Sequence, residues 1–453
     1  MKKVLSGLLC LVMLMTLVTA ALAESDGKTT LTIMYWDSTD EKENDDAYQW
    51  IMHAYEGWDK KEQVALELLP QTGGSNDMFT KANLMMQSED TAPDIYFDDS
   101  FQAVSDAAAG YLMDLTEGLA NWKTWTDGSF YEASKDMVIG ENGGIYGIPF
   151  ETDARGLWVN TQVLTDAGLG ADWAPTNWDE LLAGLRQIKE KLPDVYPIWY
   201  KPIANSEGTT VNNLLLFLMG TPDGLYDWDN GKWNVTSQGL LDTLTFYDTT
   251  IKEGLTGPLS ELVNNQTESY AYQYLRDGKL GVFVGGSWVA GSQFVQGAAF
   301  EWEGYEDSLK FIPMPTQNGE NGGYITVSGG YALTIPEKSD AKELALDFLL
   351  TMMDDVEGLC QRNIRNGSLA CRDISAAPNY AEYASRPYIE LATSFLEWTK
   401  YRPQVGTYST VSSYLSTALE AVVTGTAPMD AMNEFANNVI NAIGEEQTQR
   451  LLK

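Results

Sequence analysis

Carboxylates are the most abundant reactive groups in this sequence, which contains 64 Asp and Glu residues. Hydrolysis of a glycosidic bond needs two carboxylates at a set separation, and so many acids make each candidate pair uninformative. A serine or cysteine nucleophile usually needs a histidine base. The only histidine, His53, lies inside a predicted helix beside Tyr55 and Trp58, where we expect helix packing or surface exposure. A carbohydrate-active hydrolase, or another enzyme that uses lysine or carboxylate chemistry, therefore remains an alternative without positive support.

Motifs for other chemistry are also missing. The sequence has no G-x-S-x-G elbow, no phosphate-binding G-x-x-x-x-G-K-[ST] loop, and no His or Cys cluster spaced for zinc. The acidic pair Asp227 and Asp229 beside Gly231 suggests a calcium loop, but the twelfth position from Asp227 is Gln238 rather than a bidentate glutamate. We therefore predict no catalytic residue, no metal and no cofactor.

The N-terminus has the features of an export signal. Lys2 and Lys3 precede an apolar run over residues 4–18, and small residues follow up to Ala23. An uncleaved anchor is the alternative, although the run is shorter than the ~20 residues that span a bilayer. We predict a signal peptide over residues 1–23. Glu24 rather than a lipid-attachment cysteine follows it, so we expect an extracytoplasmic protein in the periplasm or released from the cell.

Charge and cysteine usage narrow the class further. A formal net charge of −35 repels nucleic acid and anionic lipid, and it disfavours a phosphorylated ligand. Neutral or cationic ligands fit better. Beyond the signal, only Cys360 and Cys371 remain, and either a small disulfide loop or two buried thiols is consistent with their spacing.

The elements that must position a site alternate between strand and helix. Strand patterns over residues 31–36, 64–68 and 93–97 are separated by helical patterns over 45–58 and 76–87. Further helices are predicted from 178 and over 342–353, and Asn230-Gly231 predicts a hairpin. This order predicts an α/β fold with a largely parallel sheet. The length exceeds what one core usually serves, so we expect two domains that share crossing strands.

Seven segments, in order along the chain, carry a resemblance to a known family. They are residues 31–36, APDIYFDD at 92–99, YGIPFETDARGLWVN at 146–160, 167–169, NWDEL at 177–181, DGKLGVFVGGSW at 277–288 and SGGYALTIP at 328–336. With them the chain resembles family 1 of the extracellular solute-binding proteins, the sugar-binding proteins of ABC importers that include maltose-binding protein.

The resemblance implies a periplasmic-binding-protein fold, in which two α/β lobes are joined by three crossovers and hold a ligand in the cleft. By position, lobe 1 would comprise residues 24–151 and 313–353, and lobe 2 residues 152–312 and 354–453. Crossovers are expected near 151–153, 312–315 and 353–355. The implied function is capture of a sugar or short oligosaccharide by hinge closure, and delivery to the permease subunits of the importer. We expect a monomer; a sensor protein that presents its ligand to a receptor is a further alternative.

A sugar site needs aromatic platforms for the ring face and planar polar groups for the hydroxyls. Trp36 and the acids Asp98 and Asp99 end strands, where open α/β sheets bind ligands, although a core cap or a solvated acid is the other reading. Trp288 resembles the stacking tryptophan of the family, with core packing as the alternative.

The resemblance also implies contacts from the second half of the site. Asp153 corresponds to an acidic ligand contact, and Arg155 either contacts ligand or pairs with Asp153. Either member of the pair Trp199 and Tyr200 would be a platform, because strand alternation points neighbours to opposite faces. The remaining candidates are the backbone amides of Gly330 and Tyr331, the basic residue Arg372 and the aromatic residue Tyr408.

Overall fold

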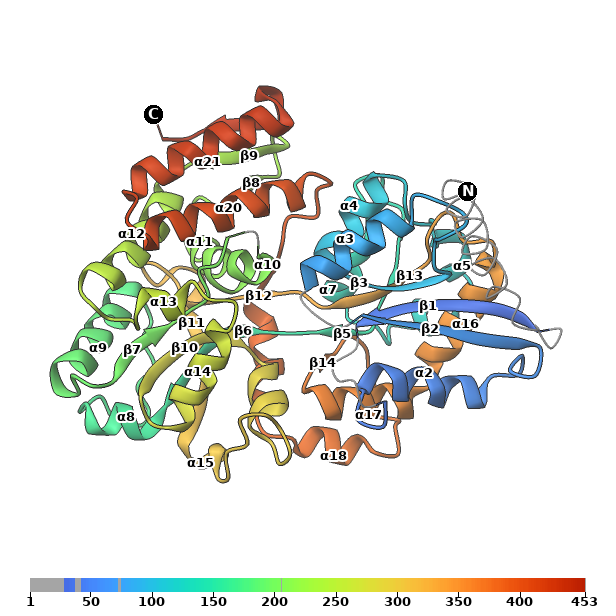
Figure 1. Ribbon diagram of the computed structural model, residues 1–453, viewed down its shortest axis with the longest axis horizontal. Helices are drawn as coiled ribbons and strands as arrows, with labels where there is room; N and C mark the ends of the chain where they lie inside the picture. Colours follow the sequence, from blue (N-terminus) through green and yellow to red (C-terminus); the bar gives the residue numbers. More distant parts are fainter. Residues whose placement is uncertain (1–27, 37–41, 72–74, 205, 453) are drawn as a thin grey trace, which may run out of the picture.

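The computed structural model describes residues 28–36, 42–71, 75–204 and 206–452. The expected signal peptide lies outside these residues. Figure 1 shows two α/β lobes joined by strands that cross between them. Among the described residues, every helix is too short or too polar to span a lipid bilayer.

The first lobe is built on a five-stranded sheet in the order β2-β1-β3-β13-β4. β1 is parallel to β2 and β3, whereas β13 is antiparallel to β3 and β4. The helices lie on the two faces of the sheet, with α3 and α4 above it and α2, α16 and α17 below in Figure 1. The bounds are β1 (Thr29–Trp36), β2 (Val64–Gln71), β3 (Ile95–Asp99), β4 (Ile148–Pro149), β13 (Tyr331–Thr334), α2 (Asp46–Gly57), α3 (Ser75–Met85), α4 (Ser100–Ala108), α16 (Lys342–Asp354) and α17 (Val356–Asn366).

The second lobe contains a six-stranded sheet in the order β15-β12-β11-β6-β10-β7. Its central strand β6 runs antiparallel to β10 and β11, so this sheet is mixed where the sequence predicts a largely parallel one. β6 enters this sheet from the segment that crosses between the lobes and lies between β10 and β11, both of which run in the opposite direction. The bounds are β6 (Arg155–Asn160), β7 (Tyr196–Trp199), β10 (Leu280–Gly286), β11 (Leu309–Pro315), β12 (Tyr324–Ser328), β15 (Thr399–Tyr401), α8 (Thr161–Asp166), α9 (Trp178–Lys191) and α14 (Thr267–Arg276).

A small sheet in the order β16-β9-β8 lies beside the long helices of the second lobe. The predicted hairpin is confirmed, since β8 and β9 pair antiparallel around Gly231, whose φ of 64° suits a glycine. These elements are β8 (Tyr226–Asp227), β9 (Lys232–Thr236), β16 (Thr448–Arg450), α12 (Gln238–Lys252), α20 (Tyr408–Val423) and α21 (Pro428–Ile443).

Short elements connect these layers. Two π-helical segments, Thr210–Leu215 and Ala290–Phe294, face the gap between the lobes through Asn212 and Ser292. The other short elements are α5 (Thr116–Leu119), α6 (Lys123–Thr126), α7 (Glu132–Lys135), α10 (Glu207–Thr209), α11 (Leu216–Leu218), α13 (Leu259–Leu262), α15 (Tyr305–Ser308), α18 (Tyr380–Ser385), α19 (Ile389–Ser394), β5 (Glu151–Thr152) and β14 (Leu369–Ala370).

The chain passes between the sheets at three places, and only one coincides with an expected crossover. The segment 151–153 leads from β5 into β6 as expected. The expected crossover at 312–315 is wrong, because β11 and β12 form a hairpin within the second sheet and the chain leaves it only at Gly329 and Gly330. The expected crossover at 353–355 is wrong as well: it separates α16 from α17, both of which pack on α2, and the chain rejoins the second sheet at β15. Residues 313–328 therefore lie with the second sheet, and α17 lies with the first lobe.

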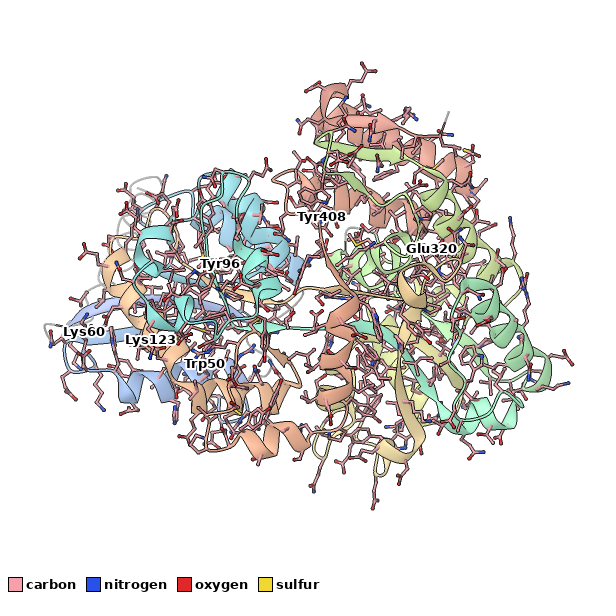
Figure 2. All side chains as sticks on the ribbon, turned by 180° about the vertical axis from the view of Figure 1, so that it is seen from behind. Trp50, Lys60, Tyr96, Lys123, Glu320 and Tyr408 are labelled. Atoms are coloured by element: carbon pink, nitrogen blue, oxygen red, sulfur yellow. The ribbon has the colours of Figure 1, made fainter. Side chains whose placement is uncertain are left out.

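The cores of the two lobes are apolar and densely aromatic. In the first lobe, Trp50 of α2 packs against Phe97 and Phe150 with ring centroids 6.0 and 5.3 Å apart. Figure 2 shows Trp50 and Tyr96 within this lobe, seen from behind. Cys360 and Cys371 are both buried and are not bonded to each other, which favours two buried thiols over a disulfide.

Candidate functional site

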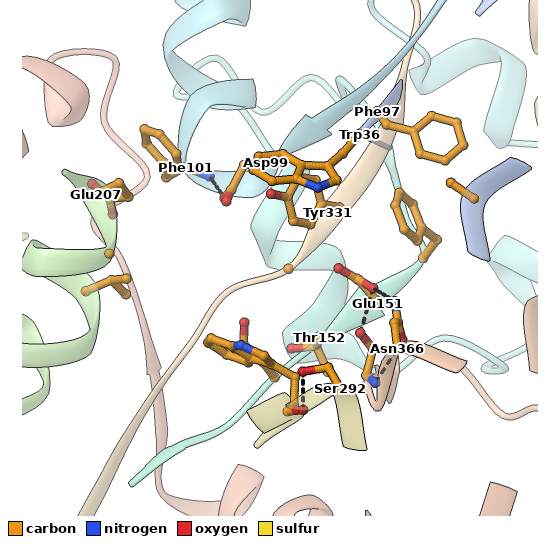
Figure 3. Close-up of a pocket in the computed structure, with 18 of the residues that line it drawn as sticks. Trp36, Phe97, Asp99, Phe101, Glu151, Thr152, Glu207, Ser292, Tyr331 and Asn366 are labelled. Carbon is orange, nitrogen blue, oxygen red and sulfur yellow. Dashed lines mark hydrogen bonds between the residues drawn. The ribbon is translucent and has the colours of Figure 1, made fainter. Parts of the chain in front are cut away.

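A cavity of about 370 Å³ lies where the lobes face each other. It is within the usual size range of ligand pockets, roughly 300–1,000 Å³. Figure 3 shows Glu207 and Phe101 at one end of it and Glu151 and Asn366 at the other. The lining residues come from both lobes and from the crossing strands between them, so movement of one lobe against the other would change its shape.

Aromatic side chains form part of the cavity wall. Trp36 ends β1 and Tyr331 begins β13, and both are partly exposed. Tyr331 is the register partner of Asp99 on β3, and Figure 3 shows Trp36, Asp99 and Tyr331 on the same wall. This wall therefore presents two flat rings beside a carboxylate, the combination that a sugar ring and its hydroxyls require.

Trp288 lines the cavity from the second lobe. It follows β10, and a Cβ atom at Gly286 would come within 1.8 Å of the Trp288 ring, so only glycine at 286 allows the ring to lie there. The Arg155 guanidinium lies 5.4 Å from the ring centroid, within the range of a cation–π contact. The Trp288 ring therefore lies against the backbone of Gly286 and near the Arg155 guanidinium, and part of the ring remains exposed.

Asp153 and Arg155 form a buried ion pair on the first crossing strand. The backbone N–H of Gly329 also donates to Asp153 Oδ1 at 3.1 Å, while Arg155 donates to Asn212 Oδ1 and to the Val327 carbonyl oxygen, each at 2.7 Å. Burial raises the pKa of Asp153 and lowers the pKa of Arg155, and attraction between the two opposes both shifts. Arg155 therefore pairs with Asp153 and also lines the cavity, whereas its contact with a ligand stays a prediction.

Glu151 is the centre of a second network. Arg362 of α17 pairs with its Oε2, which also accepts from Ser368 Oγ at 2.7 Å and from Asn366 Nδ2 at 3.1 Å. Arg362 lies 3.2 Å from Asp46 Oδ2 through Nε, and its guanidinium is 4.6 Å from the Phe150 ring centroid. The positive charge of Arg362 is thus shared between two carboxylates.

Arg402 joins the two lobes at the opposite end of the cavity. This side chain is 2% exposed, and its Nη2 donates to Asp99 Oδ1 and Ser100 Oγ, both at 2.7 Å and both in the first lobe. Its Nη1 lies 3.3 Å from Oε1 of Glu207 in the second lobe. Burial raises the pKa of Glu207, and Arg402 opposes that shift. The bridge places one cation between two carboxylates that belong to different lobes.

The structure brings seven of the twelve predicted site residues to the cavity: Trp36, Asp99, Asp153, Arg155, Trp288, Gly330 and Tyr331. Gly330 has a φ of 137°, and a Cβ atom there would lie 2.0 Å from the carbonyl oxygen of Glu151. The close approach of the two crossing strands therefore depends on this glycine.

Five predicted residues are not at the cavity, and these predictions are corrected. Asp98 is fully buried, because alternation along β3 turns it to the face opposite Asp99. Trp199 and Tyr200 are core residues that bond Thr267 and Thr250. Arg372 donates to the Met353 carbonyl oxygen within the first lobe. Tyr408 lies behind the wall, packed on Phe101 and bonded to Glu207; Figure 2 shows it on the side of its lobe that faces the other.

Sequence reasoning missed most of the polar lining. Glu207, Asn212, Arg362, Asn366 and Arg402 all reach the cavity, yet none belongs to one of the seven matching segments. They come from three helical segments and from a loop after an edge strand, and only the tertiary fold brings them together. His53 lies on the surface, 52% exposed, where it pairs with Asp355 at 2.8 Å.

Comparisons with known proteins identify similar sequences and similar folds. The arabinooligosaccharide-binding protein of Halalkalibacterium halodurans is 23% identical over 292 residues, which cover 63% of this chain and 59% of that protein. The match thus spans less than two thirds of that relative. An ABC transporter solute-binding protein of Thermotoga lettingae bound to α-D-tagatose has a TM-score of 0.75 at 22% identity, covering 92% of this chain and 100% of that one. The maltose-bound MalE3 of T. maritima has a TM-score of 0.75 at 19% identity, with coverages of 92% and 100%.

The fold of these two structures is the periplasmic-binding-protein fold, which confirms the predicted fold class. A family model described as bacterial extracellular solute-binding protein matches residues 40–354, well over half of the chain. Members of this family bind solutes and do not transform them. The chain therefore belongs to the bacterial extracellular solute-binding proteins.

Proposed function

We propose that this protein captures an uncharged sugar or short oligosaccharide in the cavity between its lobes and delivers it to the permease of an ABC importer. The observation that carries the proposal is the pairing of every arginine in the cavity wall. Arg155, Arg362 and Arg402 are each bonded to carboxylates of the protein itself. A wall whose cations are already neutralised has nothing left to compensate an anionic ligand, because a buried unpaired charge is costly.

The carboxylates of the wall are arranged to accept hydroxyl hydrogens. Within the described residues, the hydrogen bonds to Asp99 and Asp153 all reach Oδ1. The Oδ2 atoms of these two acids are therefore free to accept from a ligand. Trp36, Tyr331 and Trp288 would contact the apolar ring faces of the same ligand. Sugars bound by the similar proteins named above are consistent with this chemistry.

Ligand capture would involve closure of the lobes about the crossing segments. Residues 151–154 and the pair Gly329 and Gly330 lie between the sheets, and Arg402 contacts both lobes, so we place the hinge there. We propose that the first sheet with α17 moves as one body and the second sheet, including β11 and β12, as the other. The closed form would be the one that the permease recognises, with the protein acting as an exported monomer.

A ligand screen tests the proposal directly. Thermal shift and calorimetry with neutral mono- and oligosaccharides should identify a ligand that stabilises the protein, by about 2.7 kcal/mol at 100 times its Kd. The matching uronic acids should bind much more weakly, and the sugar should be recovered unchanged after prolonged incubation. Failure of every neutral saccharide to bind, preference for the acids, or cleavage of the sugar would contradict the proposal. N-terminal sequencing of exported protein should start at Glu24.

A further inference from the structure

Two carboxyl groups, Asp98 and Asp106, are buried near each other behind the cavity wall, and neither lines the cavity. Asp98 lies on β3, one residue before the cavity residue Asp99, and is 0% exposed. Asp106 lies on α4 and is 2% exposed. Neither oxygen of Asp98 has a hydrogen-bond partner of good geometry among the described residues, and the same holds for the buried hydroxyls of Tyr96 on β3 and Ser105 on α4.

Among the described residues, side-chain amides donate to Asp106 but not to Asp98. Gln102 Nε2 donates to Asp106 Oδ1 at 2.8 Å. The amide nitrogen of Asn83, oriented for hydrogen bonding, reaches the two oxygens of Asp106 at 3.0 and 3.1 Å. Amide donors favour the ionised carboxylate, so the electrostatic environment assigns the proton to Asp98 before Asp106.

In the part of the chain that the structure describes, neither carboxyl forms an ion pair with a lysine, arginine or histidine. The groups that act on Asp98 are acidic: Asp106 from α4 and its neighbour Asp99 on β3. Tyr96 beside it faces these same acids and Tyr331 of β13. Arg402 binds Asp99 at the end of this strand, and its charge is shared between Asp99 and Glu207.

Two buried carboxylates without a counter-ion cannot both remain ionised at low cost. Burial raises the pKa of Asp98 well above its ordinary value, repulsion from Asp106 and Asp99 adds to the shift, and the backbone N–H of Asp99 opposes it. Burial also raises the pKa of Asp106, to about 7, against the effect of Gln102. Because the two groups interact, the protons leave in steps that belong to the pair.

We propose that Asp98 and Asp106 form a proton-holding pair that stabilises the first lobe in mildly acidic conditions and destabilises it as the pH rises through neutrality. The pair also regulates the cavity, a part of the proposal that rests on the proposed function. β3 carries Asp98 and the cavity residue Asp99, and α4 carries Asp106 and the cavity residue Phe101. Loss of the first proton leaves a buried charge without a counter-ion between the strand and the helix, and this disturbs the wall that they form together.

The stability of the fold should decrease with rising pH, because the fold raises the pKa values of both carboxyl groups. A carboxyl group that is protonated in the folded protein and ionised in the unfolded chain stabilises the fold below its ordinary pKa, near 4. The stabilisation is lost as the pH rises toward 7, where Asp106 ionises within the fold. The unfolding equilibrium constant of the wild type should therefore increase with pH by more than that of a variant without the acids.

The test is chemical unfolding of the full, ligand-free chain at about pH 5 and about pH 8. We expect the unfolding constant of the wild type to rise between these values by about ten- to a thousandfold more than that of Asp106→Asn. Gln102 and Asn83 can turn their amides to satisfy the new side chain, so this variant keeps its partners. Asp98→Asn should likewise reduce the pH dependence, and Glu89→Gln, an exposed acid on the same lobe, should leave it unchanged.

Equal pH dependence in the wild type and in Asp106→Asn would overturn the proposal. Stabilisation of the wild type by added Ca²⁺, absent from Asp106→Asn, would also overturn it, since the pair would then hold a cation instead of a proton. In a second arm, affinity for the sugar found by screening should fall from pH 5 to pH 8 in the wild type and less in the variant. The unfolding arm needs no ligand, so a failed sugar screen would count against the proposed function alone.

Discussion

Replacing Arg402 by methionine should destabilise the protein far more than the loss of an ordinary salt bridge. The substitution keeps most of the side-chain length and removes the charge between Asp99 and Glu207, along with the hydrogen bond to Ser100. Breaking a buried pair by removing one partner costs about 3–5 kcal/mol, because the other charge is left buried and uncompensated. Here one substitution leaves two such acids.

The matched control is Arg186→Met. Arg186 also binds a carboxylate through two nitrogens, at 2.7 and 2.8 Å from Glu253, but its side chain is 49% exposed. Exposed pairs contribute about 0–1 kcal/mol. Urea unfolding of both variants, followed by tryptophan fluorescence, measures the difference. Equal losses in the two variants would refute the claim that burial sets the strength of the Arg402 bridge.

The same experiment has an internal check in its pH dependence. Burial already raises the pKa of Glu207, and Arg402 opposes that shift more than the hydrogen bonds from Ser412 and Tyr408 do. Without Arg402, Glu207 takes up a proton at a higher pH, so the uncompensated charge disappears in acid. The difference between the wild type and Arg402→Met should therefore shrink as the pH falls from about 8 to about 5. A difference that grows in acid would contradict this reasoning.

Three further predictions concern the site and the chain around it. Trp288→Ala should weaken binding of the screened sugar more than tenfold in calorimetry, with little change in fold. The control is Trp228→Ala, which should leave the affinity unchanged because Trp228 is 65% exposed and lies outside the cavity. Equal effects of the two substitutions would remove Trp288 from the site. Gly330→Ala should lower the free energy of unfolding by at least about 2 kcal/mol, because residue 330 has a positive φ and an added Cβ would meet the carbonyl oxygen of Glu151. The control is Gly57→Ala, where an added Cβ has no atom within 4 Å, and it should change the free energy of unfolding by less than about 1 kcal/mol. Cys360 and Cys371 should resist a thiol reagent in the native protein, since burial raises the pKa of Cys360 to about 11 and that of Cys371 well above its ordinary value. Both thiols should react once the protein is unfolded without reductant. Absence of free thiol in the unfolded protein would indicate a disulfide.

The sequence determined the fold class and the strand ends that contribute to the cavity. Alternating strand and helix patterns over residues 31–97 identify β1, β2, β3 and the helices between them, because periodicity is a local property of the chain. Trp36 and Asp99 were found for the same reason, since ligands bind at the carboxyl ends of such strands. The family resemblance added Asp153, Trp288 and Gly330.

Only the tertiary structure decided which of two neighbouring side chains faces the ligand and where the lobes exchange strands. Asp98 and Asp99 are identical neighbours that the sequence alone does not distinguish. The pleat of β3 buries Asp98 and turns Asp99 toward the cavity. Arg362 and Arg402 come from an inward-facing helix and from a loop after an edge strand, and their partners Glu151 and Asp99 lie 211 and 303 residues away in the sequence. Contacts between residues so far apart in the sequence depend on how both lobes pack, so a local sequence pattern does not predict them.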